Sequence, residues 1–314
     1  MSKLINHRAA ILRIAVLVLF CAALPSQTAA QNVAAPETKE RLKKVLVNGV
    51  ELHYLEKGKG VPVIFVHGGL DDYRMWAAQM EPFAQNYRVI AYSRRYNFPN
   101  HNPYIRPDHS AIIEADDLAA LIKKLGLGRV HIVGHSYGAF TALFLAVKHP
   151  ELVRSLVLAE APVLRWAQDR PEGKALFDEF MDNMWKPTGD AFRRGEKEQA
   201  LKLTMNYFAG PGVLDQVPQA QRDYWMSNLQ EWQALTMSRD ANPPLSRERV
   251  KRIKAPVFML SGGQTMNILK FVDSELQPLL AHVERLVIPN ATHDMWNEQP
   301  DECRRAVLAF LASN

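Results

Sequence analysis

The sequence predicts an α/β protein built on a mostly parallel sheet, with helices on both faces and an inserted helical cap. Short runs of consecutive apolar residues recur along the chain, as is typical of strands buried on both faces of a parallel sheet. Helical patterns separate most of these runs, and such alternation favours parallel strands joined by crossing helices. One long stretch, residues 162–254, has no apolar run of this kind and predicts helices only.

The expected strands and helices follow from these patterns. Six apolar runs predict sheet strands at 63–66, 88–92, 130–133, 152–159, 256–260 and 285–288. The clearest helices are expected at 111–125, 139–148 and about 301–311. Two further runs, 45–48 and 51–54, are joined by Asn48-Gly49, and Asn-Gly between strand-like runs predicts a tight β-hairpin.

The first thirty residues have the layout of a secretory signal peptide. Three basic residues accompany an apolar run at 14–24, and Thr28 and Ala30 occupy the −3 and −1 positions of a suitable cleavage site. The run is shorter than the roughly 20 residues that a membrane-spanning helix needs. The protein is therefore expected to be secreted or periplasmic, with no stable membrane insertion after cleavage; an uncleaved anchor is the alternative.

The rest of the chain divides into a core in two parts and an insertion. Residues 31–161 and 255–314 carry the expected strands, and 162–254 form the expected cap. The insertion is interrupted by prolines and glycines, which predicts several short helices. It is too long for a structureless loop within one domain.

Charge and cysteine content exclude several classes of function. The formal net charge is +5, and it falls to +2 without residues 1–30, which hold three basic residues and no acidic one. No basic stripe remains, so a nucleic-acid partner is not expected. Cys303 is the one cysteine left beyond the signal segment, so no internal disulfide is expected, and its place in a helix predicts a packed thiol.

The most specific motif is Gly-x-Ser-x-Gly at 134–138, which lies between a predicted strand and a predicted helix. In that setting the motif predicts a nucleophile elbow, a tight turn that exposes the hydroxyl of Ser136. Side chains at the two glycine positions would collide with the neighbouring strand and helix. Ser136 is therefore the candidate nucleophile.

An oxyanion hole and a general base are expected on other loops at the same sheet edge. The sequence His67-Gly68-Gly69 directly follows a strand and can supply one backbone N–H, and the residue after the nucleophile supplies the second. The candidate donors are thus the N–H groups of Gly69 and Tyr137, whereas His67 is expected to be structural. His293 follows the strand 285–288 late in the chain, where a general base belongs.

Together these features resemble the α/β-hydrolase family over nearly the whole mature chain. The resemblance rests on the hairpin, His67-Gly68-Gly69, the elbow at Ser136, the cap, and His293 with Glu298 behind it. It implies an α/β-hydrolase fold and a catalytic triad. In that family the acid usually follows the strand after the cap, but here residues 261–267 contain no carboxylate.

The triad acid is therefore expected elsewhere. Asp273 is expected inside the next helix and out of reach, and Asp294 adjoins the base itself. Glu160 lies at the end of the strand 152–159. Some family members, including certain haloalkane dehalogenases and a mycotoxin lactonase, carry their acid after this same strand, and the position of Glu160 is similar to theirs. Glu160 is the candidate acid; a surface glutamate or a cap-anchoring ion pair is the alternative.

No cofactor or metal is expected. His131 and His135 are four residues apart on a strand rather than on one helix face, and no phosphate loop or dinucleotide fingerprint is present. Arg94 and Arg95 follow the strand 88–92 and are expected to be structural, with contact to an acidic substrate group as the alternative.

The sequence thus predicts a serine hydrolase that cleaves a small or medium carboxylic ester or lactone through an acyl-enzyme. An apolar group on the substrate would suit the cap, which is rich in methionine and contains Trp166, Trp185, Trp225 and Trp232. The alternatives are a non-catalytic small-molecule-binding homologue, an amidase, or a cofactor-free haloperoxidase activity.

Overall fold

Short segments rich in apolar residues form the strands of one eight-stranded sheet in the computed structural model, which describes residues 41–103 and 106–314. The expected signal segment lies outside the described residues. The strands are β1 (Lys43–Val47), β2 (Val50–Lys57), β3 (Pro62–Val66), β4 (Arg88–Tyr92), β5 (Val130–His135), β6 (Val153–Ala159), β7 (Val257–Gly262) and β8 (Val283–Ile288). Each expected run overlaps one of these strands.

The strand order is β1-β2-β4-β3-β5-β6-β7-β8. The strand β2 is antiparallel to β1 and β4, and all other neighbouring pairs are parallel. The prediction of a mostly parallel sheet is therefore confirmed. Asn48 and Gly49 join β1 to β2 with φ values of 47° and 76°, the left-handed conformation that a two-residue hairpin turn requires.

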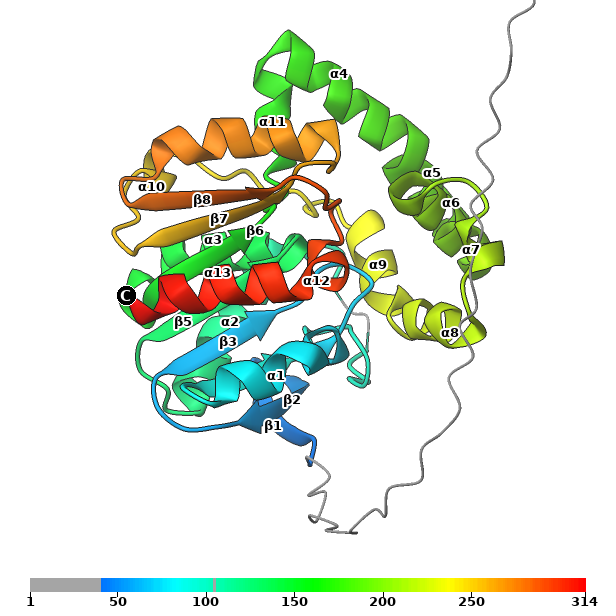
Figure 1. The fold of residues 1–314 in the computed structure, drawn as a ribbon. Coiled ribbons are helices and arrows are strands. Elements are labelled where there is room, and N and C mark those ends of the chain that lie inside the picture. Colours follow the sequence, from blue (N-terminus) through cyan, green and yellow to red (C-terminus); the bar gives the residue numbers. More distant parts are fainter. Residues whose placement is uncertain (1–40, 104–105) are drawn as a thin grey trace, which may run out of the picture. The chain divides into compact units, whose positions relative to one another are not determined.

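The sheet is buried on both faces by the core helices, which are α1 (Ala77–Ala84), α2 (Ala111–Lys124), α3 (Tyr137–Lys148), α11 (Asn267–Leu276), α12 (Met295–Glu298) and α13 (Pro300–Ala312). A further short helix, α10 (Arg247–Val250), ends the inserted segment described below and contacts α3. In β3, Ile64 and Val66 belong to the apolar core that contains α2 and α3, whereas Val63 and Phe65 belong to the core that contains α1 and α13. Figure 1 shows α1 and α13 in front of the sheet, with α2 and α3 behind it. Because successive side chains of a strand point to opposite faces of the sheet, one strand contributes apolar side chains to both cores.

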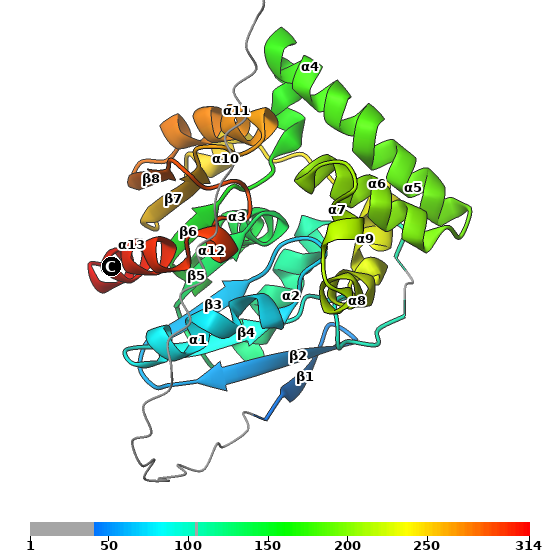
Figure 2. The ribbon, with the colours of Figure 1, turned by 45° about the vertical axis from the view of Figure 1, so that its right-hand side comes forward.

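Helices alone occupy the described segment between β6 and β7, residues 162–254, called the cap below. Figures 1 and 2 show α4 to α9 gathered at one edge of the sheet. The cap contains 3₁₀ turn η3 (Leu164–Asp169), α4 (Pro171–Phe180), π-helical turn η4 (Met181–Trp185), α5 (Lys186–Arg193), α6 (Lys197–Ala209), α7 (Val213–Gln216), α8 (Gln219–Ser227) and α9 (Leu229–Thr236) before α10.

Two glycines allow α3 to pack closely on the sheet behind the turn at Ser136. A Cβ on Gly138 would lie 2.3 Å from the carbonyl oxygen of Val66, and a Cβ on Gly134 would lie 2.6 Å from the Cα of Ala139. These neighbours are backbone atoms that cannot move aside independently. The two glycines of the motif therefore have the steric role that the sequence predicts.

We expect Gly138→Ala to lower the free energy of unfolding by about 3 kcal/mol, because the new methyl group must displace the end of β3. Gly126→Ala is the matched control, since Gly126 has φ of 64° but nothing within 4 Å of an added Cβ. Backbone strain alone should make that variant cost about 1 kcal/mol. Urea unfolding measures both variants; equal losses would contradict the steric explanation.

Candidate active site

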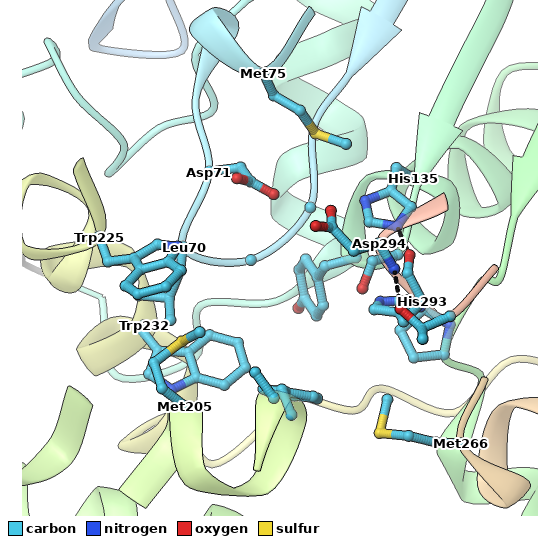
Figure 3. A pocket seen from close by; sticks show the side chains of 18 of the residues that line it. Leu70, Asp71, Met75, His135, Met205, Trp225, Trp232, Met266, His293 and Asp294 are labelled. Carbon is cyan, nitrogen blue, oxygen red and sulfur yellow. Dashed lines mark hydrogen bonds between the residues drawn. The ribbon is translucent and has the colours of Figure 1, made fainter. Parts of the chain in front are cut away.

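A cavity of about 830 Å³ lies between the cap and the loops that follow the sheet strands. Its volume lies in the range of small-molecule sites. Ser136, His293, Gly69 and Tyr137 all line it, and Figure 3 shows His293 and His135 on one side and Trp225 and Trp232 on another. The structure therefore brings four of the five sequence-predicted site residues to one cavity.

Ser136 lies at the junction of β5 and α3. Its φ and ψ are 52° and −123°, a conformation that non-glycine residues rarely adopt. The backbone N–H of Ser136 donates to the carbonyl oxygen of Ala159 at 2.8 Å, which fixes the turn to the end of β6. This strained turn presents the serine side chain at the cavity.

Glu160, the fifth predicted residue, is fully buried behind His293. Its Oε2 atom is hydrogen-bonded to Nδ1 of His293, which lies on the loop between β8 and α12. This contact leaves Nε2 of His293 available to the cavity. Glu160 has φ of 54°, so the chain makes a second unusual turn where β6 ends.

Residues at and just after the end of β7 hold the Glu160 carboxylate in place. The N–H of Gly262 donates to Oε1 at 2.7 Å, and the hydroxyl of Thr265 donates to Oε2 at 2.8 Å. Hydrogen bonds to both oxygens offset the cost of burying the charge. The segment 261–267, where the resemblance would place the acid, thus supplies donors to an acid from the preceding strand.

The other two carboxylates near the base point elsewhere. Asp273 lies on α11, as the sequence predicts, and its Oδ2 accepts from Ser261 Oγ at 2.5 Å and from Arg285 Nη2 at 3.4 Å. Asp294 accepts from the amide of Asn297 at 2.7 Å. Glu160 is accordingly the carboxylate that contacts Nδ1 of His293.

His135 supports the loop that carries His293, a contact that the sequence analysis did not find. Its Nε2 lies 2.9 Å from the carbonyl oxygen of His293, and the two rings are 4.7 Å apart. Burial, with a smaller contribution from His293, lowers the pKa of His135 to about 3. The ring is therefore neutral near pH 7, and since a carbonyl oxygen only accepts, Nε2 carries its proton.

The cap contributes most of the apolar lining. Three of the four cap tryptophans, Trp185, Trp225 and Trp232, line the cavity with Met205. Trp166 does not: its Nε1 donates to the carbonyl oxygen of Leu245 at 2.7 Å within the cap. The cap tryptophans thus divide between cavity lining and packing.

Carboxyl groups line another part of the cavity, which the sequence analysis also missed. Asp71, Asp294 and Glu298 belong to the lining, and Figure 3 shows Asp71 and Asp294 facing the same space. Burial, with smaller contributions from the nearby Asp294 and Asp72, raises the pKa of Asp71 to about 8. The hydroxyl of Tyr224 donates to Asp71 at 3.2 Å. Because its pKa is about 8, Asp71 is protonated near pH 7.

Two other sequence expectations concern cysteine and metal. Cys303 is fully buried in α13, where burial raises the pKa of its thiol to about 12. Within residues 41–103 and 106–314, no three His, Cys, Asp or Glu side chains are grouped so that they could hold a metal ion. Among these described residues, no helix is both long enough and apolar enough to cross a membrane.

We expect Asp71→Asn to stabilise the protein increasingly as the pH rises from about 4 to 8. The pKa of Asp71 is about 8 in the folded protein against a usual 3.8, so the folded state keeps a proton that the unfolded state releases. The free energy of unfolding of the wild type must therefore fall as the pH rises across that window, and the asparagine variant does not have this loss. Urea unfolding at pH 5 and 8 measures the difference; a gain of equal size at both would contradict the assignment.

Comparison with known proteins agrees with the fold. The model of the alpha/beta hydrolase family matches residues 63–306. A bifunctional esterase/perhydrolase of Acinetobacter calcoaceticus is 26% identical over 85% of this chain and 98% of its own length. A 2-hydroxy-6-oxononadienedioate/2-hydroxy-6-oxononatrienedioate hydrolase of Paraburkholderia xenovorans is 26% identical over 84% of this chain and 91% of its own.

Among solved structures, a thermophilic esterase from Thermogutta terrifontis superposes with a TM-score of 0.69 at 23% identity. The match covers 87% of this chain and 98% of the esterase. At this identity the likeness concerns the fold. With the family match over residues 63–306, it shows that the chain belongs to the alpha/beta hydrolase family.

Proposed function

We propose that this hydrolase cleaves a carboxylic ester or lactone through an acyl-enzyme formed on Ser136. The observation that supports the proposal best is the buried contact between Glu160 and Nδ1 of His293. It fixes the imidazole with Nε2 available to the cavity that Ser136 also lines. A nucleophile, a base and a group that orients the base are the parts that this chemistry needs.

In the proposed reaction His293 Nε2 takes the proton of Ser136 as Oγ attacks the carbonyl carbon. The N–H groups of Gly69 and Tyr137 stabilise the oxyanion, and Glu160 stabilises the imidazolium that forms. His293 then gives its proton to the leaving alkoxide, and water attacks the acyl-enzyme by the same steps in reverse. With a lactone, the alkoxide stays attached to the acyl group.

The lining of the cavity supports a substrate with an apolar group. The aromatic rings of Trp185, Trp225 and Trp232 offer a broad surface, and Met205 adds an adaptable one. The carboxyl groups of the lining argue against a dianionic substrate of the kind that the Paraburkholderia relative is named for. We therefore favour neutral esters and lactones.

We expect Ser136→Ala and Glu160→Gln each to lower kcat for short 4-nitrophenyl esters by about 10⁴, since each removes an essential part of one unit. Asp273→Asn is the matched control because Asp273 is a buried carboxylate near the same strand end that contacts Ser261 and Arg285 instead. It should stay within about tenfold of wild type. Release of 4-nitrophenol measures all three.

Glu160→Gln with near-wild-type turnover would refute the assignment of the acid. A wild-type protein that neither turns over esters nor reacts with a serine-directed fluorophosphonate would instead favour a non-catalytic binding protein. Labelling that disappears in Ser136→Ala would support Ser136 as the activated nucleophile.

We also expect a carboxylate on the substrate to lower kcat/KM. Arg74 is the sole Lys or Arg that lines the cavity among the residues that the structure describes, and Asp72 holds its guanidinium with two hydrogen bonds of 2.8 and 2.6 Å. Mono-4-nitrophenyl adipate should therefore react about tenfold more slowly than 4-nitrophenyl hexanoate, as expected for one unscreened like charge.

The ratio of these two kcat/KM values should widen between pH 7 and 9, because Asp71 loses its proton with a pKa of about 8. In Asp71→Asn the ratio should not change over that range. Equal reactivity of the two esters at both pH values would show that the carboxyl groups of the lining do not select by charge.

A further inference from the structure

The loop that carries Gly69 is held by a buried arginine from the neighbouring strand end. Arg94 is fully buried, its Nη2 donates to the carbonyl oxygen of Gly68 at 2.9 Å, and its Nε donates to that of His67 at 3.2 Å. The backbone N–H of Arg94 donates to Nε2 of His67 at 3.0 Å. Arg94 is thus structural, as the sequence predicts, and engages this loop rather than a substrate.

The contacts to the Gly68 carbonyl, from Arg94 and from Nδ1 of His67 at 2.9 Å, decide where the N–H of Gly69 points. The carbonyl of Gly68 and the N–H of Gly69 belong to one peptide unit, and in a trans peptide these two groups point in opposite directions. Because the carbonyl is directed at Arg94, the N–H is directed away from Arg94. Gly68 and Gly69 both line the cavity, and an oxyanion donor at Gly69 requires its N–H to face that cavity rather than Arg94.

Glu231, on α9 of the cap, holds both the arginine and the loop. Its Oε1 accepts from Arg94 Nη2 at 2.7 Å, and its Oε2 accepts from the backbone N–H of Leu70 at 3.3 Å. Leu70 has φ of 58°, an unusual conformation for a leucine that the surrounding contacts must maintain. The next residue of α9, Trp232, packs its ring against Gly69, where an added Cβ would lie 2.7 Å away.

Two adjacent glycines make such support necessary. A peptide between glycines can rotate at low energetic cost, since glycine tolerates both signs of φ. Without the carboxylate of Glu231, Arg94 would lose an ion pair and the N–H of Leu70 would lose its acceptor. The peptide unit that joins Gly68 to Gly69 could then turn its N–H away from the cavity.

We propose that Glu231 is a positioning residue through which the cap sets the oxyanion hole. The carboxylate of Glu231 fixes Arg94 and Leu70, and these two residues fix the peptide between Gly68 and Gly69. Because Glu231 belongs to α9, the orientation of the oxyanion donor depends on the packing of the cap against the core. This inference rests on the proposed ester hydrolysis and adds to it a residue that does not touch the substrate.

The test compares Glu231→Gln with Glu114→Gln. Both glutamates are fully buried and both contact Arg94, Glu114 at 3.4 Å. Glu231 uses one oxygen for Arg94 and the other for Leu70, so its glutamine must turn an NH₂ group toward one of these two donors. Glu114 contacts Arg94 through Oε1, whereas its Oε2 has no hydrogen-bond partner among the described residues and can be replaced by NH₂.

We expect Glu231→Gln to lower kcat for 4-nitrophenyl butyrate by about 10² with little change in KM, as expected when an oxyanion donor is impaired. The inhibition constant of a trifluoromethyl ketone of similar length should rise by a similar factor. This ketone forms a hemiketal in which Ser136 Oγ bonds to the carbonyl carbon, the serine proton passes to His293, and the oxyanion needs the same donors. Glu114→Gln should change neither value more than about threefold, although both variants lose stability in urea.

Equal changes in the two variants, or a loss confined to KM, would overturn the inference. If Glu231→Gln does not fold, Glu231→Asp tests the inference instead, because it keeps the charge and withdraws both oxygens by the length of one methylene. A lower kcat at unchanged KM in Glu231→Asp would support the inference, and a wild-type kcat would overturn it. An inert wild-type protein would overturn the proposed function and this inference together, whereas active wild type with unchanged Glu231→Gln would overturn the inference alone.

Discussion

The carboxylate of Glu160 receives hydrogen bonds from two segments that come much later in the chain. Gly262 ends β7, Thr265 follows it, and His293 follows β8. A buried charge is tolerated only when its oxygens are paired, so these three donors must be in place for the folded state to be stable. The position of His293, beside the cavity that Ser136 also lines, follows from this requirement. The carboxyl ends of β6, β7 and β8 are thereby brought into register around one side chain.

Most of the fold could be predicted because burial on both faces leaves a strong signal in the sequence. The strand β3 is a continuous apolar run and β5 is fully buried, and the glycines of the elbow lie where the backbone approaches too closely for a Cβ. Glu160 could be found because the usual position of the acid was empty of carboxylates, which directed attention to the neighbouring strand end. In each case the evidence lies within a few residues of the feature itself.

The contacts that escaped prediction join residues that are far apart in sequence and follow no periodic pattern. Glu231 meets Leu70 across 161 positions, and His135 meets the backbone of His293 across 158. Nothing local distinguishes Glu231 from a glutamate on an exposed helix surface. The raised pKa of Asp71 has the same origin, because it depends on burial and on carboxylates that only the fold brings near.

The turn at Glu160 comes immediately before the cap, so the acid is set by the core and not by the inserted helices. Residues 162–254 can diverge in length and composition while Glu160, Gly262 and His293 keep their mutual arrangement. Exchange of the whole cap between relatives would therefore keep the contact between Glu160 and His293, but it would remove the side chain at 231 that contacts Arg94 and Leu70. In a chimaera, the partner of the His293 imidazole would come from the recipient, and the support of the glycine loop would come from the donor.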